Sequence, residues 1–155
     1  MHQETQYLTK EKYKELQDEL EQLRKVKRKE IAEHLEYAKK LGDLSENAEY
    51  HEAREEQAEV EDRINHLEYV LKTAQILNDR HGDIAGIGST VKIQKEGDSD
   101  EKAYMIVGSE EADMMAGKIS NLSPIGTALI GKKKGDKFQV KTPKGVASYT
   151  LISIE

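Results

Sequence analysis

Glycine and proline are almost absent from the first half of this chain. Of its 11 glycines only Gly42 precedes residue 82, and both prolines, Pro124 and Pro143, come later. Uninterrupted stretches of this kind are what long helices require, because glycine and proline end them. The later glycines and prolines separate short apolar runs, which is typical of strands and turns. The sequence therefore predicts two domains, residues 1–78 and 79–155, with a boundary near Asp79 to Gly82.

Charge follows the same division. Residues 1–80 carry 14 Lys and Arg against 20 Asp and Glu, whereas residues 81–155 carry ten of each. The net charge of −6 argues against a nucleic-acid coat and makes direct DNA contact a weak expectation. No apolar run approaches about 18 residues, so we expect no membrane span. The first residues lack the pattern of a signal peptide, and cysteine is absent, so we expect a soluble, cytoplasmic protein without disulfides.

The first of two helical stretches is predicted from Thr9, a suitable N-cap, to Lys40. Its apolar side chains recur at spacings of three and four residues: Tyr13, Leu16, Leu20, Leu23 and Val26. The register then slips before the stripe resumes at Ile31, Leu35 and Ala38. Because Lys29 is followed by Glu30 rather than by a proline, we expect a smoother helix here than a proline at this position would allow.

The second stretch is predicted from Glu46 to about Leu77. It has the a/d spacing of a coiled-coil seam: Val60, Ile64, Leu67, Leu71 and Ala74. Each stretch would be roughly 48 Å long at 1.5 Å per residue, and Gly42 lies between them, where a helix end favours a residue that tolerates positive φ. Equal arms around a short turn predict an antiparallel helical hairpin. The alternative is a helix pair that dimerises through its stripe, since one seam does not say which chain covers it.

The second half predicts a small antiparallel sheet with one short helix, so the fold class of the whole chain is α+β. Strands are expected at Thr90–Ile93, Ala103–Val107, Lys137–Val140 and Ala147–Ile154. The last two form a hairpin around Pro143-Lys144-Gly145. Ser123 is expected to cap a single helical turn, with Pro124 at its first position and Gly131 closing it. Four apolar residues of this segment are then expected in the core: Leu122, Ile125, Leu129 and Ile130.

An acidic pair, Asp43 and Glu46, lies at the far end of the predicted hairpin. The i, i+3 spacing places both carboxylates on one side of a turn that enters a helix. One interpretation is helix capping, either as a capping box or with Ser45 as the cap and both acids left over. The other is a divalent cation site. Since two carboxylates hold Mg²⁺ poorly alone, such a site would be half of one, completed inside a partner.

The run from Gly42 to Gln57 closely resembles the hairpin tip of the bacterial Gre transcript cleavage factors, transcription elongation factors of the GreA type. Ser123 to Gly131 resembles their C-terminal signature, and the resemblance covers nearly the whole chain. It implies an N-terminal coiled-coil hairpin with its tip at residues 42–47 and an FKBP-like C-terminal domain. Such factors are not enzymes themselves. They dock at the secondary channel of RNA polymerase and stimulate its own cleavage of the 3′ end of backtracked nascent RNA, which rescues arrested complexes.

The resemblance also implies roles for particular residues. The two tip acids of the family correspond to Asp43 and Glu46, which would help the polymerase site to hold its second Mg²⁺ and orient the attacking water. No cofactor is expected on the chain alone. Contact with RNA or the channel wall is assigned to three basic residues: Arg54, Lys39 and Lys40. Docking on the polymerase is assigned to Asn121, Ser123 and Pro124.

These assignments have simpler alternatives. The two lysines would also compensate a helix dipole, and Ser123 and Pro124 would serve as cap and first-turn residues alone. A basic cluster midway along the arm is either a solvated face or a contact with RNA or an acidic channel: Lys25, Lys27, Arg28 and Lys29. We expect the free protein to be a monomer.

Two other functions compete with the elongation factor. A peptidyl-prolyl isomerase needs an aromatic-lined pocket, and the second half offers only Tyr104, Phe138 and Tyr149; moreover, fold does not carry function. A coiled-coil chaperone or scaffold would favour an apolar tip, whereas this tip is acidic.

Overall fold

The computed structural model describes residues 5–43, 46–77 and 82–155. These residues form two compact units: Tyr13–Thr73, and the remainder of the described chain. Most of the boundary predicted near Asp79 to Gly82 falls on residues 78–81, which lie outside the described residues. In the parts that are described, no helix is both long enough and apolar enough to cross a membrane.

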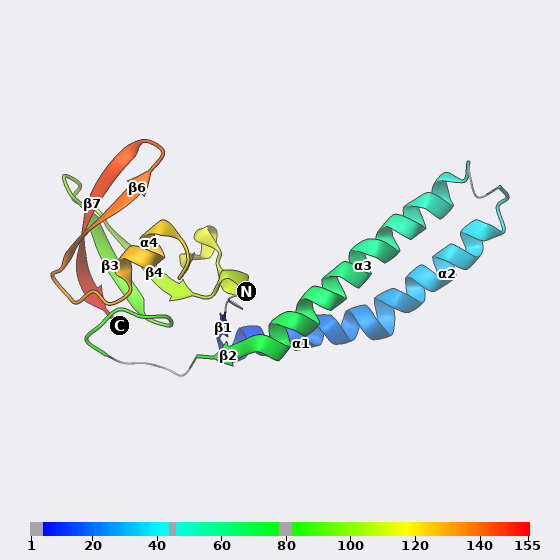
Figure 1. Ribbon diagram of the computed structural model, residues 1–155, viewed down its shortest axis with the longest axis horizontal. Coiled ribbons are helices and arrows are strands. Elements are labelled where there is room, and N and C mark those ends of the chain that lie inside the picture. Colours follow the sequence, from blue (N-terminus) through cyan, green and yellow to red (C-terminus); the bar gives the residue numbers. More distant parts are fainter. Residues whose placement is uncertain (1–4, 44–45, 78–81) are drawn as a thin grey trace. The chain divides into compact units, whose positions relative to one another are not determined.

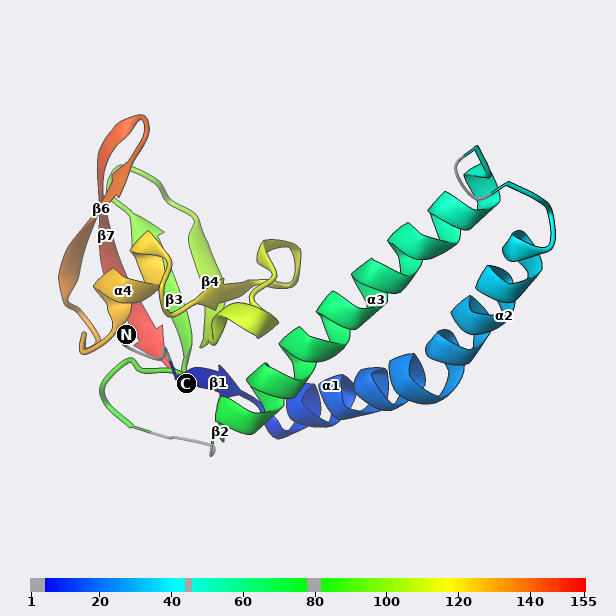
Figure 2. The same cartoon turned by 45° about the vertical axis from the view of Figure 1, so that its right-hand side comes forward.

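The first unit is the predicted antiparallel hairpin. Its outgoing arm consists of α1 (Lys10–Gln22), the π-helical turn η1 (Leu23–Lys27) and α2 (Arg28–Lys39), and its returning arm is α3 (Ala48–Thr73). Figures 1 and 2 show α2 and α3 side by side, joined at the far end of the arm. Both stripes are buried against each other within one chain, so the seam is already covered. The buried residues are Leu16, Leu20, Ile31, Ala38, Ala53, Val60, Ile64, Leu67 and Val70.

The slip in the first stripe has a structural cause. A strict seven-residue repeat that starts at Tyr13 would place apolar residues one position before Ile31 and Ala38. The π-helical turn η1 contains one residue more than an α-helical turn and therefore absorbs the extra residue. Val26, within this turn, is 44% exposed and takes no part in the core. The regular α-helix is thus interrupted here although no proline is present, because the stripe requires the extra residue to be accommodated.

The returning helix is shorter than predicted. It ends at Thr73 instead of continuing to Leu77, and Ala74–Ile76 forms the strand β2. This strand pairs in parallel with β1 (Gln6–Leu8), and the Leu77 N–H donates to the Leu8 C=O at 2.8 Å. Tertiary pairing with a fully buried Leu8 overrides the local helix preference. Both strands belong to the second unit.

The second unit is built on a five-stranded sheet with the order β5-β4-β3-β7-β6 (Figure 1). The four predicted strands are confirmed with longer bounds: β3 (Thr90–Lys95), β4 (Glu101–Val107), β6 (Lys137–Thr142) and β7 (Gly145–Ile154). Three of the pairings are antiparallel, but β5 (Lys118–Ser120) pairs in parallel with β4 and was not predicted. A three-residue strand carries too little period-two pattern to be recognised.

The sheet core also positions the short helix. Apolar residues of the sheet and α4 (Pro124–Leu129) form one cluster: Ala85, Val91, Ile93, Ile106, Ile119, Leu129, Phe138, Val140 and Leu151. Two 3₁₀ turns, η2 (Ser109–Glu111) and η3 (Met114–Ala116), connect β4 to β5. Of the four residues expected in the core around α4, Leu129 is buried and Ile125 packs against the cluster, whereas Leu122 and Ile130 are 55% and 42% exposed. The prediction was wrong for these two because they flank the helix and leave its buried face.

Candidate functional site at the hairpin tip

The outgoing arm ends abruptly at the tip. The N–H of Lys40 donates to the C=O of Tyr37, and that of Leu41 to the C=O of Ala38, each at 3.1 Å. Gly42 follows with φ of +130°, a region in which side chains other than glycine are strained, as predicted. The chain thereby leaves the helix axis within one residue and enters the turn that carries the acidic pair.

Asn47 organises the tip on the returning side. Its Oδ1 accepts the N–H of Tyr50 at 3.1 Å, which makes it the N-cap of α3. Its Nδ2 donates to the C=O of Ala38 at 2.6 Å, in the last turn of α2. One side chain therefore satisfies an orphan donor of α3 and adds a second hydrogen bond to the Ala38 C=O of α2, which also accepts the N–H of Leu41. Of the interpretations of the acid pair, the capping box does not apply to α3, because both acids precede its cap position. Ser45, the other candidate cap, lies outside the described residues.

Asp43 and Glu46 flank the two residues of the turn that lie outside the described chain, and both side chains are exposed. Asn47 caps α3, and both acids precede this cap position in the sequence. Acids close before a helix N-terminus also lie at the positive end of the helix dipole. The arrangement presents two carboxylates at the end of a hairpin whose core does not depend on them.

His34 was not singled out from the sequence, yet it faces the acidic side of α3. Its Nε2 lies 3.5 Å from a carboxylate oxygen of Glu49, and its Nδ1 lies 3.8 Å from one of Glu56. His51, on the first turn of α3, contacts the ring of Tyr50 edge-on at 5.9 Å between centroids. The antiparallel pairing of α2 with α3 brings His34 there, and no local spacing could have indicated it.

The three basic residues assigned to RNA or channel contact all lie on exposed parts of the hairpin. Arg54 donates to Gln57 Oε1 at 3.1 Å, one turn further along α3. Lys40 is the C-cap of α2, with its ammonium 4.0 Å from Glu36. Lys39 occupies the last turn of α2. The two lysines are therefore placed to compensate the helix dipole, the simpler alternative, and remain accessible from solvent.

The basic cluster midway along the arm is mostly paired with acids. Arg28 holds Glu61 across the hairpin with two hydrogen bonds of 2.7 Å, and Lys27 holds Glu56 at 2.5 Å. Lys25 pairs with Glu21 on its own helix. Arg24, beside the cluster, likewise pairs with Glu68 and Arg63 with Glu19. This pairing supports the solvated, paired face over an RNA contact for Lys25, Lys27 and Arg28.

The same pairs change the ionisation of the acids involved. A hydrogen bond from Lys27 lowers the pKa of Glu56, and one from Arg28 lowers the pKa of Glu61. A hydrogen bond from Lys25 lowers the pKa of Glu21. Conversely, the hydrogen bond to Glu56 raises the pKa of Lys27. The charged forms of these acids therefore persist to lower pH in the folded hairpin.

The segment assigned to docking lies at the start of α4 in the second unit. Ser123 Oγ accepts the N–H of Gly126 at 3.1 Å and donates to the Ser120 C=O at 2.6 Å, so its predicted capping role is confirmed. Pro124 follows at the first helical position and is exposed. A Cβ on Gly126 would come within 2.0 Å of the Ser120 oxygen, so only glycine fits there.

Asn121 and the exposed Leu122 border a surface pocket of about 190 Å³ beside these caps. Tyr7 of β1 and Ser109 of η2 also line it. The pocket combines one apolar side chain with polar groups, a composition that suits contact with another macromolecule. The sequence did not indicate that β1 would contribute to this surface.

The comparisons with known proteins cover the chain almost from end to end. A family model described as "Transcription elongation factor, N-terminal" matches residues 6–76, and one described as "Transcription elongation factor, GreA/GreB, C-term" matches residues 80–155. A transcription elongation factor GreA from Clostridium botulinum is 50% identical over 149 residues, which are 95% of this chain and 93% of that protein. One from Streptococcus sanguinis is 46% identical over 157 residues, 100% of this chain and 98% of that protein. The crystal structure of GreA factor homolog 1 from Thermus thermophilus is 31% identical, with coverage of 97% and 98% and a TM-score of 0.44.

The helical hairpin, the mixed sheet with its short helix, and the two family-model matches define a transcription elongation factor. The chain belongs to the GreA/GreB family, and its relatives at 43–50% identity over nearly their full length make it GreA-type.

Proposed function

We propose that this protein binds RNA polymerase through its second unit and stimulates the polymerase's own cleavage of backtracked nascent RNA. Removal of the extruded 3′ end allows an arrested complex to resume synthesis. Family membership supports the transcriptional role. The observation that carries the cleavage role is the tip, where Asn47 takes over helix capping and leaves Asp43 and Glu46 exposed.

Asp43 and Glu46 fit part of a Mg²⁺ site rather than a whole one. Carboxylate oxygens are ligands that Mg²⁺ accepts, usually one or two together with waters and substrate phosphates. Among residues 5–43, 46–77 and 82–155, no group of three or more His, Cys, Asp or Glu residues is placed to hold a metal. The remaining ligands would come from the polymerase. A Mg²⁺ ion held there would activate the attacking water and stabilise the leaving oxygen of the phosphodiester.

The chain's own residues act by position and charge. Asp43 and Glu46 present negative charge at the end of the arm and accept hydrogen bonds from a water that they orient. Asn47 ties the first turn of α3 to the last turn of α2, which would support the position of the acids at the end of the arm. Arg54, Lys39 and Lys40 supply positive charge beside them for the RNA phosphates. Such preorganisation is how a distant scaffold contributes to a rate.

Docking is proposed at Asn121, Ser123 and Pro124. The exposed Leu122 lies among them and gives the segment an apolar contact that a polymerase surface would bury. The loop is held by hydrogen bonds to Ser123 and by the tight contact at Gly126, so binding would cost little ordering of the backbone. The protein is then an accessory factor without catalytic activity of its own.

The double substitution Asp43→Asn and Glu46→Gln tests the proposal. We expect loss of stimulated cleavage by about a hundredfold or more, because two neutral amides are weaker Mg²⁺ ligands and no longer orient the water. Polymerase binding should remain, since the docking residues lie in the other unit. The measurements are cleavage of RNA in stalled elongation complexes and a direct binding assay.

Glu52→Gln is the matched control. This residue is exposed on the first turns of α3 and is not one of the tip acids, so its substitution should leave cleavage intact. Near-normal cleavage by the double variant would remove the role of the acid pair. Loss of cleavage in both variants would indicate a general effect of negative charge along α3.

No observation favours the two alternative functions. Phe138 is only 5% exposed and stacks on Tyr149 at 5.6 Å between centroids, and Tyr104 packs against the same core. These aromatic side chains build the sheet core. Phe138 also lines a groove beside α4, but no second aromatic residue of the described chain lines that groove, as proline isomerisation would require. A scaffold acting through an apolar tip has only Leu41, 52% exposed, to support it among the described tip residues.

A further inference from the structure

A basic segment in the second unit contrasts with the acidic chain as a whole. Residues 132–144 contain six lysines and only one acid, Asp136: Lys132, Lys133, Lys134, Lys137, Lys141 and Lys144. Five of these lysines are exposed and Lys132 is half-buried. Within the described ranges none of them forms an ion pair, whereas most basic residues in the middle of the hairpin do. The segment therefore carries positive charge that no ion pair within the described ranges neutralises.

This segment includes β6, which is the last strand of its sheet and pairs with β7 on one side only. The Ser148 C=O on β7 accepts the N–H of Glu96 at 2.8 Å, on the β3 side. Ser148 and its β6 partner Gln139 are therefore a non-hydrogen-bonded pair of the antiparallel ladder. By the same alternation, the backbone groups of Lys137, Gln139 and Lys141 point away from β7, toward the open edge.

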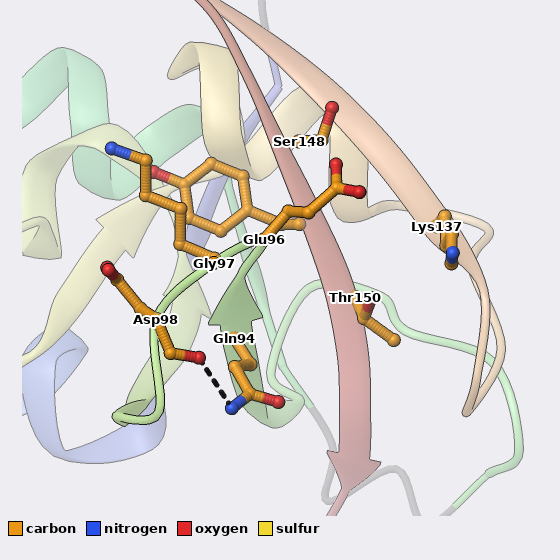
Figure 3. Close-up of a pocket in the computed structure, with 9 residues that line it drawn as sticks. Gln94, Glu96, Gly97, Asp98, Lys137, Ser148 and Thr150 are labelled. Carbon is orange, nitrogen blue, oxygen red and sulfur yellow. Dashed lines mark hydrogen bonds between the residues drawn. The ribbon is translucent and has the colours of Figure 1, made fainter.

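A groove of about 730 Å³ runs beside this edge. Ala128 and the exposed Ile130, from α4 and the residue after it, line it together with Phe138. Lys132 and Lys137 lie in its wall, opposed by one acid, Glu96. Figure 3 shows Lys137 on β6 beside Ser148 and Thr150 of β7, around a smaller pocket of about 140 Å³ on the turn after β3.

We propose that the open edge of β6 binds an extended acidic segment of a partner protein by strand addition. The backbone of such a segment would pair with the outward N–H and C=O groups of Lys137, Gln139 and Lys141. Because side chains of a strand alternate, one set would lie along the lysines and the other would enter the groove at Ile130. An alternating acidic and apolar sequence is the ligand that this combination selects.

Two simpler explanations make different predictions. Lysines on an edge strand also prevent edge-to-edge pairing between copies, but that role requires no groove and no lysines in the preceding loop. A nucleic acid would be attracted by the same charge, yet it would use the lysines alone and ignore the strand edge. Strand addition is favoured because the charge, the unpaired backbone and the groove coincide.

The probe is a fluorescein-labelled peptide of about ten residues that alternates Glu and Val, titrated with the full chain at low salt. Lys137→Glu with Lys141→Glu should weaken binding by about tenfold or more, because the charges across the contact become alike. Gln139→Pro should remove binding while the fold remains, since its N–H faces the open edge and proline is tolerated there. Lys92→Glu with Lys102→Glu, on β3 and β4, changes the net charge equally and should bind as the unmodified chain does.

A second reagent keeps the test independent of variant folding. The same peptide, N-methylated at alternate residues, retains its charge but cannot donate to the strand edge, and should not bind the unmodified chain. Equal binding by the methylated peptide, or by Gln139→Pro, would overturn strand addition. Tighter binding of a single-stranded oligonucleotide of equal charge, unaffected by Gln139→Pro, would overturn strand addition in favour of a phosphate-binding patch. Absence of peptide binding at low salt would also overturn strand addition.

Discussion

At the scale of single residues, the tip depends on a side chain that performs no chemistry. Asn47 accepts a hydrogen bond from the first turn of α3 and donates one to the last turn of α2. An aspartate at this position could accept but not donate, and an alanine could do neither. The two substitutions therefore separate capping of the helix from the connection between the helices.

We expect Asn47→Asp to keep the stability of the hairpin and to reduce stimulated cleavage, because α3 remains capped while the two helix ends are no longer tied. Asn47→Ala should reduce stimulated cleavage and should also lower the free energy of unfolding by about 1–2 kcal/mol, because the cap of α3 is lost. Urea unfolding gives the stability, and amide exchange at Tyr50 reports the cap directly. Cleavage by Asn47→Asp at the level of the unmodified protein would mean that the connection to Ala38 does not position the acids.

The acid pair and Asn47 differ in how far the sequence alone indicates their roles. Asp43 and Glu46 were proposed as site residues because they match the family's tip acids and lie between two predicted helices of equal length. Spacing alone gave them the wrong structural role, as a cap. Asn47 lies within the run that resembles the family's tip, but its hydrogen bond to Ala38, nine residues earlier in the sequence, depends on the antiparallel packing of α2 and α3. A local pattern contains no information on such a contact.

At the scale of elements, the π-helical turn keeps two parts of one stripe in register. Deletion of Val26 should convert η1 to regular α-helix and leave Ile31 and Ala38 facing α3, so we expect the melting temperature to change by only a few degrees. Deletion of Glu33, an exposed residue of α2, removes the same length where no extra residue is present. This deletion should rotate the apolar residues that follow Glu33 in α2 away from α3 and lower the free energy of unfolding by several kcal/mol.

Thermal unfolding followed by helical circular dichroism compares the two deletions. Equal destabilisation by both would show that η1 does not serve to absorb a residue. The sequence showed the offset in the apolar repeat before Ile31, but it did not show which backbone structure accommodates that offset. A kink, a loop and a π-helical turn all correct the same offset, and only the packing of α2 on α3 selects between them.

The ion pairs along the hairpin predict how its stability responds to acid. Glu21, Glu56 and Glu61 have pKa values below their ordinary 4.5 in the folded state, mainly through hydrogen bonds from Lys25, Lys27 and Arg28. A lowered folded-state pKa contributes stability that is present above the unfolded value and is lost as pH falls through the folded value.

The melting temperature of the hairpin should therefore be constant from neutral pH to about 5 and fall below about 4.5. Because the pairs are exposed, the fall should be small and should shrink further in high salt. The double variant Glu56→Gln with Glu61→Gln should show a flatter acid limb than the unmodified protein. Thermal melts over a pH series measure it, and an unchanged acid limb in the variant would assign the response to other carboxylates.

At the scale of the whole molecule, the compact units of the structure do not follow the division of the chain that its glycine content predicted. The division in glycine content predicted that residues before 79 form one domain, but the strands β1 and β2 belong to the compact unit that contains the sheet. Gly108 shows how closely they pack, because a Cβ there would meet the Tyr7 oxygen at 2.0 Å. Composition averages over long windows and does not detect two strands of three residues each, so this part of the organisation was not predictable.

The contact that joins the chain's beginning to the sheet unit can be measured. Glu111 is 6% exposed and accepts the N–H and hydroxyl of Thr9 at 3.2 and 2.9 Å, with Lys118 Nζ at 3.2 Å. Thr9 also caps α1 through the N–H of Lys12.

Thr9→Val and Glu111→Gln should each lower the free energy of unfolding by about 1–3 kcal/mol, because a buried polar group loses a partner. If the two side chains act as one unit, the double variant should cost less than the sum by about 1 kcal/mol or more. Thr9→Ser keeps the hydroxyl and should stay close to the unmodified protein. Urea unfolding with amide exchange at β4 as the readout gives these values, and additive costs would show that the N-terminal segment and the sheet are stabilised independently.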